Sequence, residues 1–124
     1  MRAFATSLTS MATSLYIVVR HRKDADQPWA NQWDDDDILA AITTTRDLAA
    51  KLAQANGEWV FVHRCTWGSE QHRICCAVRV TDVNAIDRGS ALVRFNSGAV
   101  VDRMPPVSPA RGQNWYVAPA IEPA

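Results

Sequence analysis

Residues 58–80 read EWVFVHRCTWGSEQHRICCAVRV and contain two strand patterns joined by a turn. The first pattern, residues 58–64, has β-branched and aromatic residues on both faces, which is typical of a strand buried on both sides. Gly68 and Ser69 supply turn residues. From 72 to 80 apolar and polar residues alternate, so we expect a half-exposed strand that pairs with the first strand as a hairpin.

Further strand patterns lie on either side of this hairpin. Residues 15–20, LYIVVR, are apolar on both faces and predict a central, buried strand. Residues 91–95 and 99–101 flank the turn signal at 96–98, so a second hairpin is expected there.

The segment from residue 34 to 55 predicts helix. The aspartates at 34–37 suit a helix N-terminus, where the macrodipole favours negative charge. Threonines at 43–45 interrupt the pattern, and a second helix follows at 46–55 with Thr44 as its cap; one bent helix is the alternative. On a helix, Asp34 and Asp37 would share a face, as carboxylates of a magnesium site do, although helix capping already explains the acidic run.

Together these patterns predict an α+β domain spanning residues 14–104. Its expected core is a mostly antiparallel, curled or barrel-like sheet of about five strands, with one bent helix or two short helices packed on one face. Residues 1–13 predict a flexible leader. Residues 105–124 hold five of the six prolines and predict an extended tail that docks back on the domain through Trp115 and Tyr116.

Composition argues against several classes of function. The 124 residues suit one domain, and thirteen basic side chains balance thirteen acidic ones, which argues against a dedicated nucleic-acid binder. No apolar run reaches the roughly 18 residues of a membrane span, so no membrane partner is expected. Three cysteines, an odd number without a secretory signal, indicate reduced thiols in a cytoplasm.

The hairpin carries a possible zinc pattern. His63, Cys65, His72 and Cys75 have the spacing H-x-C-x(6)-H-x(2)-C, and imidazole with thiolate suits zinc. If Cys65 pairs with His72, Cys75 points to the other face. If the register slips by one, His63 faces Cys75, and His72 no longer lies with them on the same face. A regular hairpin therefore collects three ligands at most, and only a bulge could add the fourth. Because buried cysteines are commonly structural, we assign no metal ligand and no cofactor from the sequence.

The same residues allow an enzymatic alternative, a hydrolase with Cys65 as nucleophile and His63 or His72 as base. The leading interpretation is instead a non-enzymatic ligand-binding or interaction module that forms a homodimer. Its cleft would be cationic and aromatic and would take a nucleotide or a nucleic-acid strand. The expected ligand-binding residues are Arg22, Trp59, Arg64, Trp67 and Arg73. A purely structural homodimer is the third possibility.

Two resemblances accompany these patterns. Residues 34–39, 43–45 and 60–67 give the chain a texture similar to small α+β proteins encoded on bacterial mobile (integron) gene cassettes, which implies a bacterial cytoplasmic origin and no particular function. A helix ending at Gly57, followed by the strands of the hairpin, resembles the order in PUA-like barrels of the EVE and ASCH groups. That resemblance implies binding of RNA or modified nucleobases in an aromatic pocket, but the chain holds no pocket motif of those groups.

Overall fold

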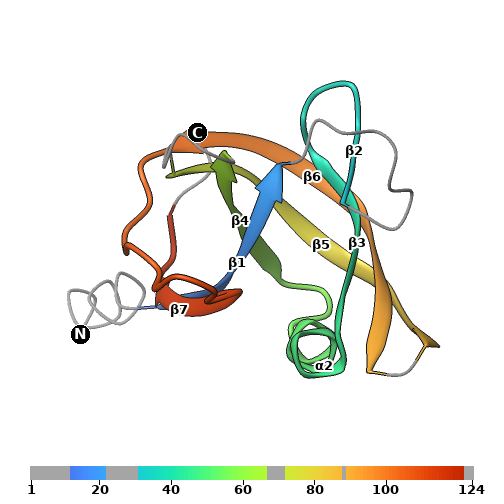
Figure 1. Cartoon of the computed structure of the whole chain (residues 1–124). Helices are drawn as coiled ribbons and strands as arrows, with labels where there is room; N and C mark the ends of the chain where they lie inside the picture. The colour runs from blue at the N-terminus through green and yellow to red at the C-terminus, as the bar shows by residue number, and fades with distance from the viewer. Residues whose placement is uncertain (1–11, 22–30, 67–71, 88, 122–124) are drawn as a thin grey trace, which may run out of the picture.

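The computed structural model describes residues 12–21, 31–66, 72–87 and 89–121. Within these ranges it contains seven strands in one open sheet and one helix (Figure 1). The elements in chain order are β1 (Thr13–His21), β2 (Gln32–Trp33), β3 (Leu39–Thr45), α2 (Arg46–Gln54), β4 (Trp59–Thr66), β5 (His72–Asp87), β6 (Ser90–Arg103) and β7 (Trp115–Pro119).

The strand order is β2-β3-β6-β5-β4-β1-β7, in which β1 and β4 are parallel and all other neighbours are antiparallel. The parallel pair arises because the chain makes a crossover through β2, β3 and α2 between β1 and β4. The α+β prediction is confirmed at this level. The sheet differs from the expected one, because it has seven strands instead of five, is mixed and does not close into a barrel.

The helix expected after the aspartate run is a strand. Asp37 has a φ of 61°, which an α-helix cannot contain, and the Asp34 carboxylate accepts hydrogen bonds from the amides of Asp36 and Ile38 at 2.9 Å. The aspartates therefore form a turn between β2 and β3. The β-branched residues that follow pair with β6, with Ile42 opposite Val93. This pairing overrides the helical pattern of the segment.

The second predicted helix is present as α2. The Leu48 amide donates to Thr45 Oγ1 at 3.3 Å, so the N-cap is Thr45, one residue after the predicted cap. Leu48, Ala49 and Leu52 are buried against the sheet. The helix thus covers one face of the sheet, as its apolar stripe predicts.

The second predicted hairpin does not form. Residues 96–98 lie inside β6, which pairs along the long strand β5, with Ser97 opposite Arg79 and Gly98 opposite Val78. Gly98 is there for packing, because a Cβ at this position would overlap Cγ2 of Ile38. The glycine signals a close approach of side chain to backbone instead of a turn.

The sheet buries side chains on both faces. The face covered by α2, here called the helix face, carries the larger core, which includes Ile17, Val60, Val62 and Val78. The opposite face, here called the tyrosine face, carries the smaller core. Its buried members are Tyr16, Phe61, Ile74, Ala77, Val101, Tyr116 and Ala118.

Strand β7 is the edge strand that pairs with β1 (Figure 1). Trp115 packs on the helix face, where the Lys51 ammonium lies 4.7 Å from its ring centroid. Tyr116 packs on the tyrosine face beside Tyr16, which is its register partner on β1 and lies on the same face. Of the leader predicted for residues 1–13, the first eleven lie outside the described residues, and Thr13 begins β1. In the described ranges no helix has the length and apolarity to cross a membrane.

Candidate metal centre

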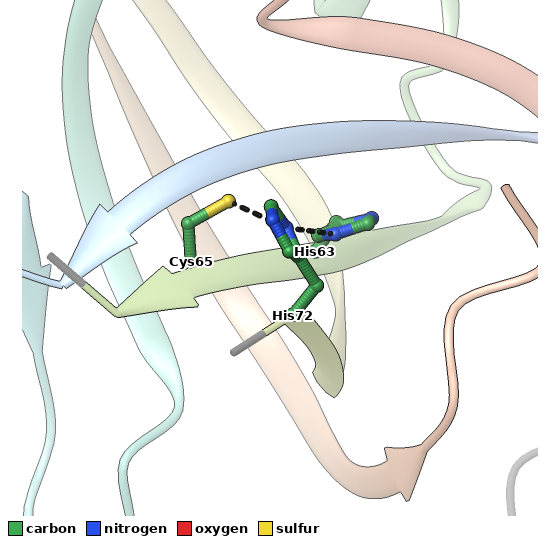
Figure 2. Close-up of side chains that lie close together, drawn as sticks. All are labelled: His63, Cys65 and His72. Carbon is green, nitrogen blue, oxygen red and sulfur yellow. Dashed lines mark hydrogen bonds between the residues drawn. The ribbon is translucent and has the colours of Figure 1, made fainter. Parts of the chain in front are cut away.

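Three potential ligands meet on the tyrosine face where β4 ends and β5 begins (Figure 2). His63 and Cys65 project from the same face of β4 because alternate side chains of a strand point the same way. His72, the first residue of β5, is the register partner of Cys65. Of the two registers weighed from the sequence, the structure has the one that unites His63, Cys65 and His72.

The ligand atoms of these residues lie close together. Nδ1 of His72 is 3.0 Å from Sγ of Cys65 and 3.0 Å from Nε2 of His63. One donor atom from each residue lies within 4.8 Å of the other two. A tetrahedral zinc ion, with bonds of about 2.0–2.3 Å, holds its ligand atoms about 3.3–3.6 Å apart. Small rotations of the three side chains would therefore point all three donor atoms at one cation.

Hydrogen bonding alone satisfies this arrangement poorly. Nδ1 of an imidazole carries either one proton or one lone pair, yet His72 Nδ1 has two partners, Cys65 Sγ and His63 Nε2, at the same distance. One proton or one lone pair serves only one of them well. A cation at the centre would use a lone pair from each of the three atoms, so the geometry favours a metal ion.

His63 has the protonation state that a metal ligand needs. Its side chain is fully buried, whereas His72 and Cys65 are partly exposed. Burial, and then the neighbouring His72, lower the pKa of His63 from 6.5 to about 4. The ring is therefore neutral at physiological pH, and neutral imidazole is the form that binds metals.

Two tyrosines complete the surroundings of His63. The hydroxyl of Tyr116 lies 2.6 Å from Nδ1 of His63, the ring nitrogen that faces away from His72. The Tyr116 ring stacks on Tyr16 with a centroid separation of 4.9 Å, and Tyr16 stacks on Phe61 at 5.0 Å. The Tyr16 hydroxyl donates to the carbonyl of Pro119 at 2.6 Å. These contacts fix the position of the Tyr116 ring, whose hydroxyl contacts His63.

The fourth residue of the sequence pattern, Cys75, stays outside the cluster. The structure does contain a bulge here, since Val62 pairs with Cys76 and His63 pairs with Ile74. In this register alternation places Cys75 on the helix face, and the bulge brings Cys76 onto the same face, where the two Sγ atoms lie 3.6 Å apart. The hydrogen bond to Cys76, followed by burial, raises the pKa of the Cys75 thiol, which opposes the thiolate form that binds metals.

The residues expected to form an arginine and aromatic cleft are divided between the two faces. Arg64 and Arg73 are register partners, and they form ion pairs with Asp37 at 4.0 Å and with Asp102. Trp59 packs on the opposite, tyrosine face, where Arg79 lies 4.3 Å above its ring. The structure therefore does not bring Trp59 together with Arg64 and Arg73. The remaining two residues, Arg22 and Trp67, lie outside the described residues, and nucleotide binding stays a prediction.

The aspartates considered for magnesium are used in the β2–β3 turn. Asp34 accepts two backbone hydrogen bonds, and Asp37 lies beside Arg64. They do not lie on a helix, and the metal-ligating cluster found among the described residues contains neither. Nothing in their arrangement favours a cation over the turn itself.

The sequence pattern identified the three residues of the cluster but missed Tyr116 and Tyr16 as their neighbours. No signal in the chain relates β7 to the β4–β5 hairpin, because strand β1 separates them and Tyr116 follows His63 by 53 positions in the sequence. Comparison of the chain with protein-family models, with curated proteins and with solved structures found no significant match in any of the three. Any functional assignment therefore depends on the fold and the site.

Proposed function

We propose that this protein binds a zinc ion through Nε2 of His63, Sγ of Cys65 and Nδ1 of His72. The observation that supports it most directly is the convergence of three electron-pair donors on one point, two of them 3.0 Å from His72 Nδ1. Thiolate and imidazole donors suit zinc and other soft or borderline metals, whereas magnesium and calcium prefer oxygen donors.

Three protein ligands would leave one coordination position of a tetrahedral zinc ion open. Structural zinc sites usually have four protein ligands, whereas catalytic sites have three and leave one position for water or substrate. Among the described residues no fourth His, Cys, Asp or Glu joins the cluster. A metal ion held in this way would lower the pKa of its bound water to about 7 and would support hydrolysis of a polarised bond. We propose metal-assisted hydrolysis as the reaction that such an open position would support.

Metal titration of the full chain after treatment with a chelator tests the proposal. We expect a single equivalent of Zn²⁺ by calorimetry, and a thiolate-to-metal charge-transfer band when Co²⁺ replaces it. Cys65→Ser should abolish the band and His72→Gln should weaken binding at least tenfold. Cys75→Ser is the matched control and should leave both unchanged, because Cys75 lies on the other face. Absence of binding by the unaltered chain, or a band that depends on Cys75, would refute the zinc site.

A second candidate is thiol chemistry at the metal-free site, favoured by the 3.0 Å contact between Cys65 Sγ and His72 Nδ1. In that case His72 would take the thiol proton, and the Cys65 thiolate would attack the substrate. Iodoacetamide measures this directly, since the sulfur bonds to its methylene carbon and iodide leaves. Rapid alkylation of Cys65 at neutral pH, slowed by His72→Gln, would favour the thiol function; slow alkylation in the metal-free protein would exclude it.

A further inference from the structure

The C-terminal strand delivers a hydroxyl group to the buried histidine of the site. Tyr116, on β7, has its hydroxyl 2.6 Å from Nδ1 of His63, and the two rings meet edge to face at 5.6 Å and 84°. Tyr116 is buried, and its ring is almost parallel to that of Tyr16, with an interplanar angle of 6°. The hydroxyl position is therefore set by packing before any metal binds.

The tautomer of His63 decides whether this residue can bind a metal. Nε2 faces His72 and the centre of the cluster, while Nδ1 faces Tyr116. Metal binding requires a lone pair on Nε2, so the ring proton must be on Nδ1, where it can be donated to the Tyr116 oxygen. In the metal-free protein the hydroxyl can instead donate to Nδ1, and Nε2–H then points at His72. A hydroxyl group serves both tautomers because it both donates and accepts.

We propose that Tyr116 is a positioning residue of the metal centre, whose oxygen holds His63 as the Nδ1–H tautomer with Nε2 directed at the metal. This inference rests on the zinc site proposed above. Metal-bound histidines generally donate their second ring N–H to an acceptor, and loss of that acceptor typically lowers metal affinity 10- to 100-fold. The C-terminal strand is thus a functional part of the site.

Two tyrosine variants separate this role from simple packing. Tyr116→Phe removes the hydroxyl and keeps the aromatic stack. Tyr16→Phe is the matched control, because it removes a neighbouring buried hydroxyl that bonds to the Pro119 carbonyl on β7 and not to His63. Zinc affinity, measured by competition with a chromophoric chelator, should fall about 10- to 100-fold in Tyr116→Phe and change less than about threefold in Tyr16→Phe.

Nitrogen NMR of the zinc-loaded protein supplies a signal that a change in packing alone would not alter. We expect a hydrogen-bonded Nδ1–H proton of His63 in the unaltered chain and in Tyr16→Phe, and its shift or loss in Tyr116→Phe. Equal zinc affinity of Tyr116→Phe and the unaltered chain would overturn this inference alone. An equal loss of zinc affinity in both tyrosine variants would also overturn it, because it would show that the hydroxyl groups act only by holding β7 against β1. Failure of the unaltered chain to bind zinc would overturn the metal site and this inference together.

Discussion

The hydroxyl of Tyr116 lies 2.6 Å from Nδ1 of His63, although the two residues are 53 positions apart in the chain. The two residues come from strands that are not neighbours, since β1 lies between β7 and β4. A site whose ligands all come from one hairpin is therefore oriented by the last strand of the sheet. Metal binding and the docking of β7 should consequently be linked, because each stabilises the same conformation of His63.

Hydrogen exchange should reveal this linkage. Zinc is expected to slow amide exchange in Trp115–Pro119 more than in β2 and β3, which lie at the other edge of the sheet. This difference in slowing between β7 and the strands β2 and β3 should be smaller in Tyr116→Phe, because that variant lacks the hydroxyl that connects β7 to His63. Exchange measured by mass spectrometry with and without zinc provides the test. Equal slowing of all strands would show that zinc stabilises the fold only as a whole.

The stability of the metal-free protein should fall as the pH is lowered from 6.5 to about 4. In this range His63 binds a proton in the unfolded chain but not in the folded protein, where its pKa is about 4. As the pH falls, the unfolded state therefore binds a proton before the folded state does. This lowers the free energy of the unfolded state and so lowers the free energy of unfolding. A pKa difference of this size corresponds to roughly 3 kcal/mol, present in full above pH 6.5.

Urea unfolding in the presence of a chelator, repeated across this range, measures the effect. His63→Gln should remove most of the pH dependence, while His72→Gln, which keeps the imidazole buried but removes the smaller effect of the neighbouring charge, should retain most of it. The same slope in His63→Gln and in the unaltered chain would show that other groups cause it.

A side chain at position 98 should destabilise the protein while Ile38 is present. A Cβ at position 98 would overlap Cγ2 of Ile38, so Gly98→Ala is expected to destabilise the protein by about 1–3 kcal/mol. Ile38→Ala removes that methyl group, and in this background the same glycine substitution should cost much less. Denaturant unfolding of both single variants and the double variant gives the coupling. Additive effects would mean that the overlap is relieved by movement elsewhere.

The N-cap of α2 should contribute measurably to stability. Thr45 Oγ1 accepts from the Leu48 amide at 3.3 Å, so Thr45→Ala is expected to lower the free energy of unfolding by about 1 kcal/mol. Thr45→Ser keeps the hydroxyl and should cost far less. Thermal unfolding followed by circular dichroism distinguishes the variants. A loss of equal size in Thr45→Ser would attribute the effect to the threonine methyl group in β3.

Local patterns predicted part of the fold correctly. The strand signals at 58–64 and 72–80 and the stripe of Leu48 and Leu52 correspond to β4, β5 and α2. The predictions failed at 34–42 and at 96–98, where pairing with β6 and β5 decides the backbone conformation. Helix-like acidic residues and a turn-like Asn-Ser-Gly report local preference, which is weaker than a ladder of cross-strand hydrogen bonds.

The candidate site divides in the same way. The sequence by itself determined which side chains could share a face, because alternation along β4 and pairing across a hairpin are local rules. Those rules place His63, Cys65 and His72 together once the register is known. Only the tertiary structure decided that register, the bulge that places Cys76 on the same face as Cys75, and the arrival of Tyr116 from β7. These depend on which strands become neighbours, and strand order is set by burial over the whole sheet, not by any one segment.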